Sequence, residues 1–89
     1  MIMYKDLYSE EITKKLMKIK KKDPVEFLQI RKKMDAIIAD PTHRYKFLMH
    51  DMKGLHRVHL GHFVLVFSID HQNKTISFED YDHHDNIYK

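Results

Sequence analysis

A segment near the middle of the chain carries a guanidinium and an imidazole at alternate positions. Arg57 and His59 lie within residues 55–60, a segment whose composition predicts a β-strand. Alternate residues of a strand point to one face, so Arg57 and His59 would lie side by side. A phosphate-binding guanidinium beside a proton-transferring imidazole suits chemistry on a phosphodiester. An exposed sheet face with ordinary polar residues would show the same pattern.

The scarcity of arginine adds weight to Arg57. The chain has 13 lysines and three arginines. Arginine binds phosphate through a planar, bidentate fork that lysine lacks. Anion recognition is therefore the favoured role for Arg57.

The C-terminal segment, residues 79–88, interleaves carboxylates with a histidine pair: His83 and His84 lie between Asp82 and Asp85. Such an imidazole is a candidate general base or acid, because a nearby carboxylate orients the ring and holds its pKa near working pH. The same residue types could bind a metal ion, but adjacent histidines tend to point apart, and HxH and HExxH spacings are absent. We therefore expect no metal site and no cofactor. A plain polar turn is the remaining interpretation.

The N-terminal half contains a lysine-rich helix. Ser9 is a suitable N-cap, and an apolar stripe of Ile12, Leu16 and Ile19 follows it. Many lysines on a few turns would attract a polyanion such as RNA. The candidate RNA-binding or ribosome-binding residues on this helix are Lys14, Lys15, Lys18, Lys21 and Lys22. The solvated face of an amphipathic helix explains the pattern equally.

Charge is distributed unevenly along the chain. Residues 1–46 carry 12 Lys or Arg against 7 Asp or Glu, whereas residues 47–89 carry 4 against 6. Seven of the eight histidines lie in the second range. This asymmetry favours a basic docking surface in the first half and titratable chemistry in the second.

A strand and two helices are predicted in the first half of the chain. Residues 3–8 predict an edge strand, and a helix of about 12 to 14 residues follows Ser9. The second helix begins at Asp23 and Pro24, a cap followed by a residue suited to the first turn, and it ends at Ala39. The junction is short enough to force an antiparallel hairpin.

Three further strands are predicted over residues 55–60, 63–69 and 75–81. Gly61 marks a tight turn that needs a positive φ, and residues 70–74 form a looser turn. Residues 63–67 are apolar on both faces and predict a central strand. The order βααβββ, with a tail over residues 82–89, predicts an α+β fold: an N-terminal antiparallel helix hairpin packed on a twisted, mainly antiparallel sheet.

The composition of the whole chain limits the class of protein. Its 89 residues fit a single domain over residues 1–89, with a small core that a partner would help to stabilise. The absence of cysteine fits a reducing cytoplasm. No signal peptide is evident, and no apolar run approaches the ~18 residues that span a bilayer. We therefore expect a cytoplasmic protein without a membrane partner.

Three stretches of the chain carry a family resemblance: KKLMKIKKKDP from residue 14, KGLHRVHLG from residue 53 and HHDNIY from residue 83. With the order βααβββ, they resemble the RelE/ParE superfamily of toxins from type II toxin–antitoxin systems, most closely an archaeal branch. The resemblance covers nearly the whole chain. It implies a small ribosome-dependent endoribonuclease, an mRNA interferase, that cuts mRNA in the ribosomal A site and is silenced by a small antitoxin.

The resemblance also implies roles for individual residues. Arg57 matches the first strand arginine, which contacts phosphate, and Lys53 matches a position that is commonly basic. His83 matches the histidine of a C-terminal His-Arg pair, and Tyr88 matches the closing aromatic residue. His59, beside Arg57, joins the candidate RNA-binding residues.

Two positions depart from the family pattern. Val64 and His84 stand where many members have arginines that supply charge in the transition state. Either histidines replace those arginines or cleavage is weak.

The leading hypothesis is metal-independent RNA cleavage by attack of the 2′-hydroxyl on the adjacent phosphate. His83 or His84 would act as the base, and Asp85 would orient an imidazole. Arg57, helped by Lys53, would stabilise the transition state. Tyr88 would stack on a base or assist the leaving oxygen.

Three other functions remain open from the sequence. The first is a catalytically weak or inactive module that binds an antitoxin and takes part in autoregulation. The second is a gyrase poison of the ParE type, and the third is a His/Asp metalloprotein. Whether the chain is an endoribonuclease or a non-catalytic module, the apolar strand over residues 63–67 and the helix edges would offer a surface to the antitoxin.

Overall fold

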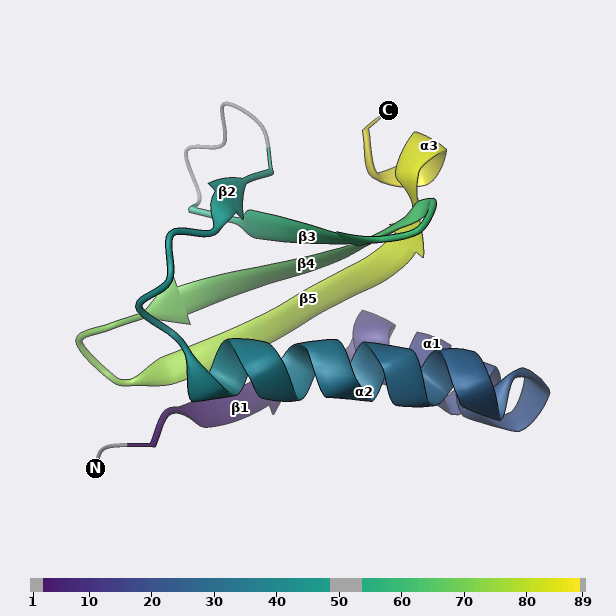
Figure 1. The fold of residues 1–89 in the computed structure, drawn as a ribbon, viewed down its shortest axis with the longest axis horizontal. Helices are drawn as coiled ribbons and strands as arrows, with labels where there is room; N and C mark the ends of the chain where they lie inside the picture. Colours follow the sequence, from purple (N-terminus) through teal and green to yellow (C-terminus); the bar gives the residue numbers. More distant parts are fainter. Residues whose placement is uncertain (1–2, 49–53, 89) are drawn as a thin grey trace.

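The structure, a computed structural model, describes residues 3–48 and 54–88. Its elements are β1 (Lys5–Tyr8), α1 (Glu10–Lys22), α2 (Pro24–Ala39), β2 (Lys46–Phe47), β3 (His56–Leu60), β4 (Phe63–Asp70), β5 (Thr75–His83) and α3 (His84–Ile87). The five strands form one sheet in the order β1-β5-β4-β3-β2, with β1 parallel to β5 and the other neighbours antiparallel. The helices α1 and α2 form a hairpin packed on this sheet (Figure 1). The α+β fold predicted from the sequence is confirmed.

Local hydrogen bonds determine where the two long helices begin and end. The Ser9 hydroxyl accepts from the backbone N–H of Ile12 at 3.0 Å and caps α1. The Asp23 carboxylate accepts from the N–H of Glu26 at 3.1 Å and caps α2. The N–H of Asp23 in turn donates to the carbonyl of Ile19 at 2.7 Å. Asp23 thus joins the end of α1 to the start of α2, and the predicted hairpin follows.

The core lies between this hairpin and the sheet face on its side, which we call the helix face. Its buried residues are at most 3% exposed: Ile12, Ile30, Met34, Ile37, Leu65, Phe67, Ile76, Phe78 and Tyr81. Val58 and Leu60 of β3 pack against them. The prediction of a central strand is confirmed, because β4 lies between β3 and β5 and its residues 64–67 are at most 3% exposed.

The two predicted turns are also present. Gly61 joins β3 to β4 with a φ of 62°, the left-handed conformation that glycine adopts without strain. The looser turn between β4 and β5 is held by Asp70, whose Oδ1 accepts from the backbone N–H of Asn73 at 3.0 Å. Lys74 has the positive φ, 54°, in that turn.

A bulge in β5 decides which side chains share a face. Val66 pairs with Asp80 and Phe67 pairs with Phe78, so Glu79 has no partner in β4. Phe78 and Tyr81 can therefore both point to the helix face although they are three residues apart. The opposite face, which we call the arginine face, carries Arg57, His59, Val64, Val66, Asp80 and Asp82.

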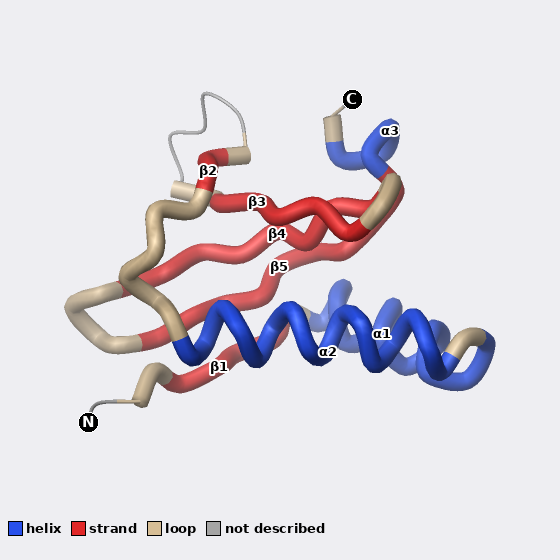
Figure 2. The backbone as a smooth tube through the Cα atoms, in the orientation of Figure 1, coloured by secondary structure: helices blue, strands red, loops and turns tan. Residues whose placement is uncertain are grey.

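Two parts of the described chain differ from the sequence prediction. The tail expected over residues 82–89 is wrong in its first part, because β5 continues to His83 and residues 84–87 form α3. The short strand β2 was not predicted, since its two residues are too few for alternation to show. Figure 2 shows α3 beside the β3–β4 turn and apart from the long helices. No helix in the described parts of the chain is long and apolar enough to cross a membrane.

Candidate functional site

The strand β3 places Arg57 and His59 together on the arginine face, as alternation predicts. The Nη1 of Arg57 lies 3.4 Å from the Nδ1 of His59. The Nε of Arg57 donates to the carbonyl oxygen of Phe47 in β2 at 3.1 Å. This bond orients the guanidinium through Nε and leaves its outer edge to bind an anion.

The helix α3 brings two C-terminal aromatic rings to this pair. The rings of His59 and His84 are stacked with their centroids 6.0 Å apart, and the Tyr88 ring lies 4.6 Å from that of His84. The backbone N–H of His84 donates to the carbonyl of His62 at 2.8 Å, which fixes α3 to the β3–β4 turn. Arg57, His59, His84 and Tyr88 thus form one cluster, which we call the Arg-His cluster.

His83 lies apart from this cluster. Its ring packs edge-on against Phe63 at 5.6 Å and stacks on His62 at 6.2 Å. Its Nδ1 accepts from the backbone N–H of Asp85 at 3.2 Å and caps α3. The two histidines that are adjacent in sequence therefore have different surroundings: His84 stacks on His59, and His83 supports the local fold.

The carboxylate of Asp85 lies near both imidazoles without a side-chain hydrogen bond to either. Its carboxylate oxygens are 3.6 Å from the Nδ1 of His84 and 3.7 Å from the Nδ1 of His83. Its side chain is 83% exposed. Asp85 therefore adds negative charge near both rings and holds neither one rigidly.

The pKa of His59 is lowered from its ordinary value. Loss of hydration is the largest cause, and the neighbouring charges of Arg57, His84 and Lys46 act in the same direction. A lowered pKa keeps the imidazole neutral at neutral pH, and a neutral imidazole can accept a proton. The cluster thus pairs a proton acceptor with a permanent cation.

Lys15 is held by carboxylates on the arginine face. Its Nζ lies 2.7 Å from Asp80 and 2.9 Å from Asp82. Desolvation lowers the pKa of Lys15, but the hydrogen bonds to Asp80 and Asp82 outweigh it and the net pKa is raised. Hydrogen bonds from Asn86 and then Lys15 hold the pKa of Asp82 at about 2. Lys15 therefore ties α1 to β5.

The other predicted lysines of α1 are exposed: Lys14, Lys18, Lys21 and Lys22. Lys18 and Lys22 follow Lys15 at intervals of three and four residues, so they continue along the same side of α1. Lys53, a further predicted contact, lies outside the described residues.

Three cations beside Arg57 were missed by the sequence analysis. Lys33 of α2, Arg44 and Lys46 line a hollow of about 360 Å³ together with Arg57 and His59. The signal in the sequence is HRYKF at residues 43–47, where basic and aromatic residues are interleaved. Lys46 pairs directly with Arg57 across β2 and β3. In residues 3–48 and 54–88, no three His, Asp or Glu side chains form a possible metal site.

Two known proteins are similar to this chain over most of its length. A protein of Methanocaldococcus jannaschii named "Putative toxin RelE4" is 46% identical over 88 residues, which are 98% of this chain and 93% of that protein. An uncharacterized protein of Methanosarcina mazei is 48% identical over 79 residues, 88% of this chain and 91% of that protein. The chain belongs to the RelE toxin family.

Solved RelE structures share the fold. The toxin–antitoxin complex RelBE2 from Mycobacterium tuberculosis matches with a TM-score of 0.74 at 18% identity, over 92% of this chain and 99% of the other. The archaeal RelE–RelB complex from Pyrococcus horikoshii matches with a TM-score of 0.64 at 22% identity, over 93% and 97%. No family model matches the sequence.

The two departures from the RelE pattern lie next to the Arg-His cluster. Val64 is fully buried and pairs with His59 on one side and Asp82 on the other. His84 stacks on His59. In this RelE chain, a buried valine and an imidazole thus stand at the two positions where the family resemblance implies guanidinium groups.

Proposed function

We propose that this chain is the toxin of a type II toxin–antitoxin system and that it cleaves mRNA on the ribosome. The observation that supports this most is the Arg-His cluster: a β3 guanidinium and imidazole meet a second imidazole from α3. Membership of the RelE toxin family makes the toxin role the natural context for that cluster. The protein would act in the cytoplasm, where ribosomes and mRNA are present.

The proposed reaction needs a proton acceptor, a proton donor and a cation. Neutral His59 would take the proton of the 2′-hydroxyl, whose oxygen attacks the adjacent phosphorus. The bond from phosphorus to the 5′-oxygen then breaks, and His84 would give a proton to that oxygen. Arg57 would stabilise the negative charge that builds on the phosphate. The products are a 2′,3′-cyclic phosphate and a free 5′-hydroxyl.

The remaining predicted site residues have secondary roles in this proposal. Tyr88, against His84, would stack on a base or assist the leaving oxygen. His83 would act through α3, because its ring caps the helix that carries His84. Lys14, Lys18, Lys21 and Lys22 would hold ribosomal or messenger RNA by charge.

The test compares the wild type with Arg57→Ala, His59→Gln and His84→Gln after induction in a heterologous host. Growth, protein synthesis and mRNA 5′ ends on ribosomes are measured. Gln72→Ala is the control, because Gln72 is exposed at the β4–β5 turn and lies outside the Arg-His cluster and the hollow beside Arg57. We expect the cluster variants to lose toxicity and the control to keep it. Equal toxicity of the wild type and Arg57→Ala would refute the role of Arg57.

We propose a small antitoxin as the partner. Of the two solved structures that share the fold, one is a toxin–antitoxin complex, RelBE2, and the other is a RelE–RelB complex. The strand over residues 63–67 was expected from the sequence to be part of the docking surface for the antitoxin, but residues 64–67 are at most 3% exposed and offer almost no surface to a partner. The exposed apolar residues of the helices and β1 are better candidates. They are Leu7, Met17, Val25 and Leu28, each more than half exposed.

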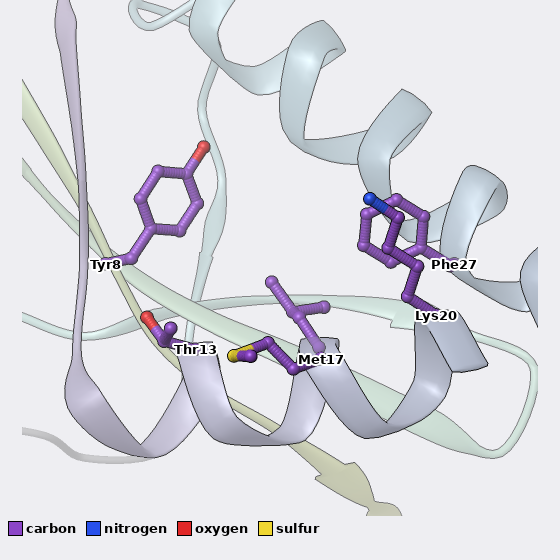
Figure 3. Close-up of a pocket in the computed structure, with 6 residues that line it drawn as sticks. Tyr8, Thr13, Met17, Lys20 and Phe27 are labelled. Carbon is purple, nitrogen blue, oxygen red and sulfur yellow. The ribbon is translucent and has the colours of Figure 1, made fainter. Parts of the chain in front are cut away.

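An apolar hollow of about 300 Å³ lies among β1, α1 and α2 and includes one of these residues, Met17. Figure 3 shows Tyr8 and Phe27 on two sides of it and Met17 along α1 between them. An apolar side chain of an antitoxin would fit there. Replacing Met17 by Asp should weaken binding of the product of the adjacent gene, whereas Lys14→Asp, a charge change outside the hollow, should not. Equal binding by wild type and Met17→Asp would exclude this surface.

A second candidate function is a non-catalytic module that retains the toxin fold. The buried Val64 in place of a charged residue beside His59 favours it. Absence of growth arrest and of mRNA cleavage on expression would support this function. Cuts in the ribosomal A site would exclude it.

A further inference from the structure

Two hollows lie on either side of the segment that leads from α2 to β2, and they differ in chemistry. The first, described above, has a volume of about 360 Å³ and is lined by cations. The second has a volume of about 410 Å³ and is lined mainly by aromatic rings. Both share His43, Arg44 and Tyr45. A ligand that crosses this segment would contact both.

The first hollow, which we call the basic hollow, suits a phosphate. Lys33, Arg44, Lys46 and Arg57 line it, and no carboxylate from residues 3–48 or 54–88 does. Among the described residues, none of these four forms an ion pair with an Asp or Glu. Four cations that lie close together repel one another, and an anion bound among them would relieve that repulsion.

The second hollow, which we call the aromatic hollow, suits a planar ring. Phe47 is 57% exposed, and one face of its ring is stacked on His56 with centroids 4.7 Å apart and planes at 23°. Tyr45 stands edge-on to the buried Phe67 at 5.2 Å, so its position is fixed by the core. Exposed aromatic rings held in place offer a stacking surface for nucleobases.

The two hollows are linked by a direct hydrogen bond. The carbonyl of Phe47 accepts from the Nε of Arg57 at 3.1 Å. The backbone of Phe47 also pairs with His56 in the sheet. The stacking ring and the phosphate-binding arginine are thus held at a constant separation by strand pairing, which is what recognition of a base and its phosphate together requires.

We propose that this region is a nucleotide subsite for single-stranded RNA, with a phosphate in the basic hollow and a neighbouring base on Phe47. The inference rests on the proposed function, because it takes RNA to be the molecule that reaches Arg57. By holding one base on Phe47, the subsite would fix the position of the RNA along the protein surface. That position would determine which phosphate of the RNA lies beside His59.

The test measures binding in the absence of cleavage. The probes are a short fluorescent 2′-O-methyl RNA, which lacks the attacking hydroxyl, and a strand of the same length and backbone with abasic positions. Affinity for both is measured by fluorescence anisotropy over a range of salt concentrations. The variants are Phe47→Ala, Phe47→Trp, Lys46→Ala and Arg44→Ala. The controls are Leu28→Ala, a similarly exposed apolar residue, and Lys32→Ala, a lysine of α2 outside the basic hollow.

Phe47→Ala is expected to weaken binding of the base-bearing strand by about fivefold or more and to leave the abasic strand unchanged. Phe47→Trp should retain binding. Lys46→Ala and Arg44→Ala should weaken both strands and reduce the slope of log affinity against log salt by about 0.7 for each lost phosphate contact. Leu28→Ala and Lys32→Ala should bind like the wild type.

Two results would overturn the subsite. One is equal binding of both strands by wild type and Phe47→Ala. The other is a loss of salt dependence in Lys32→Ala as large as that in Lys46→Ala. Because the probes cannot be cleaved, these results are separate from the toxicity of Arg57→Ala. A toxic Arg57→Ala would remove the proposed role of Arg57 in cleavage and leave the binding result standing.

Discussion

Replacement of Lys15 by Met is a direct test of the link between α1 and the arginine face. The Lys15 ammonium lies within hydrogen-bond distance of Asp80 and Asp82. Methionine keeps most of the length of the side chain and removes its charge. Two carboxylates in the same strand would then face each other without a cation.

The expected loss of stability follows from the shift in pKa of Asp82. That pKa is lowered from 3.8 to about 2. At 1.36 kcal/mol for each pKa unit, the whole shift corresponds to about 2.4 kcal/mol. Asn86 is the larger cause and Lys15 the second. With about 30% of the Asp82 side chain exposed, solvent screening leaves about 1 kcal/mol for Lys15.

The assay is urea unfolding of wild type, Lys15→Met and Lys14→Met across a series of pH values. A depressed carboxyl pKa stabilises the fold above the unfolded pKa of 3.8, and that stability is lost as pH falls toward about 2. The difference between wild type and Lys15→Met should therefore be full at pH 7 and shrink below pH 4. Lys14→Met, on the exposed side of α1, should match the wild type. An equal loss in both variants, or a difference that does not change with pH, would refute the reasoning.

Three further predictions concern the core, a turn and the cluster. Met34→Ala should cost about 2–5 kcal/mol in urea unfolding, because Met34 is fully buried, whereas Met17→Ala, at 60% exposure, should cost less than about 0.5 kcal/mol. Gly61→Ala should lower the free energy of unfolding by about 1 kcal/mol through backbone strain alone, since no atom lies within 4 Å of an added Cβ. Gly61→Asn should lower it by less. An unchanged urea midpoint for Gly61→Ala would contradict the prediction. If His59 is the base, the rate of cleavage plotted against pH should begin to fall only below pH 6.5, the ordinary histidine pKa, because the pKa of His59 is lowered. This fall at low pH should be absent in His59→Gln. The same dependence of rate on pH in both proteins would exclude His59 as the base.

The local parts of the fold could be predicted from the sequence because their causes are local. Ser9 and Asp23 cap helices through hydrogen bonds to residues three positions ahead. Gly61 adopts the positive φ that its turn requires. Pairings between distant segments could not be predicted in this way. The parallel contact of β1 with β5 joins residues about 70 positions apart and leaves no periodic signal in either strand.

The site was predictable to the same extent. Arg57 and His59 are neighbours by strand alternation, a property of one segment. The basic hollow was missed because it combines Lys33 from α2, Arg44 and Lys46 from the following segment, and Arg57 from β3. Only the packing of α2 against the sheet brings those three segments together.

The different surroundings of His83 and His84 depend on the bulge at Glu79. Without a bulge, strict alternation after Phe78 would direct His83 away from the helix face. The unpaired Glu79 shifts the alternation by one residue, so His83 packs against Phe63 instead. The carbonyl of Glu79 accepts from the hydroxyl of Ser9 at 2.6 Å, so the residue that caps α1 also holds the bulge. A contact at the start of α1 thus helps to place His83 against Phe63 and to leave His84 as the one of the pair that stacks on His59, a difference that two adjacent histidines do not reveal in the sequence.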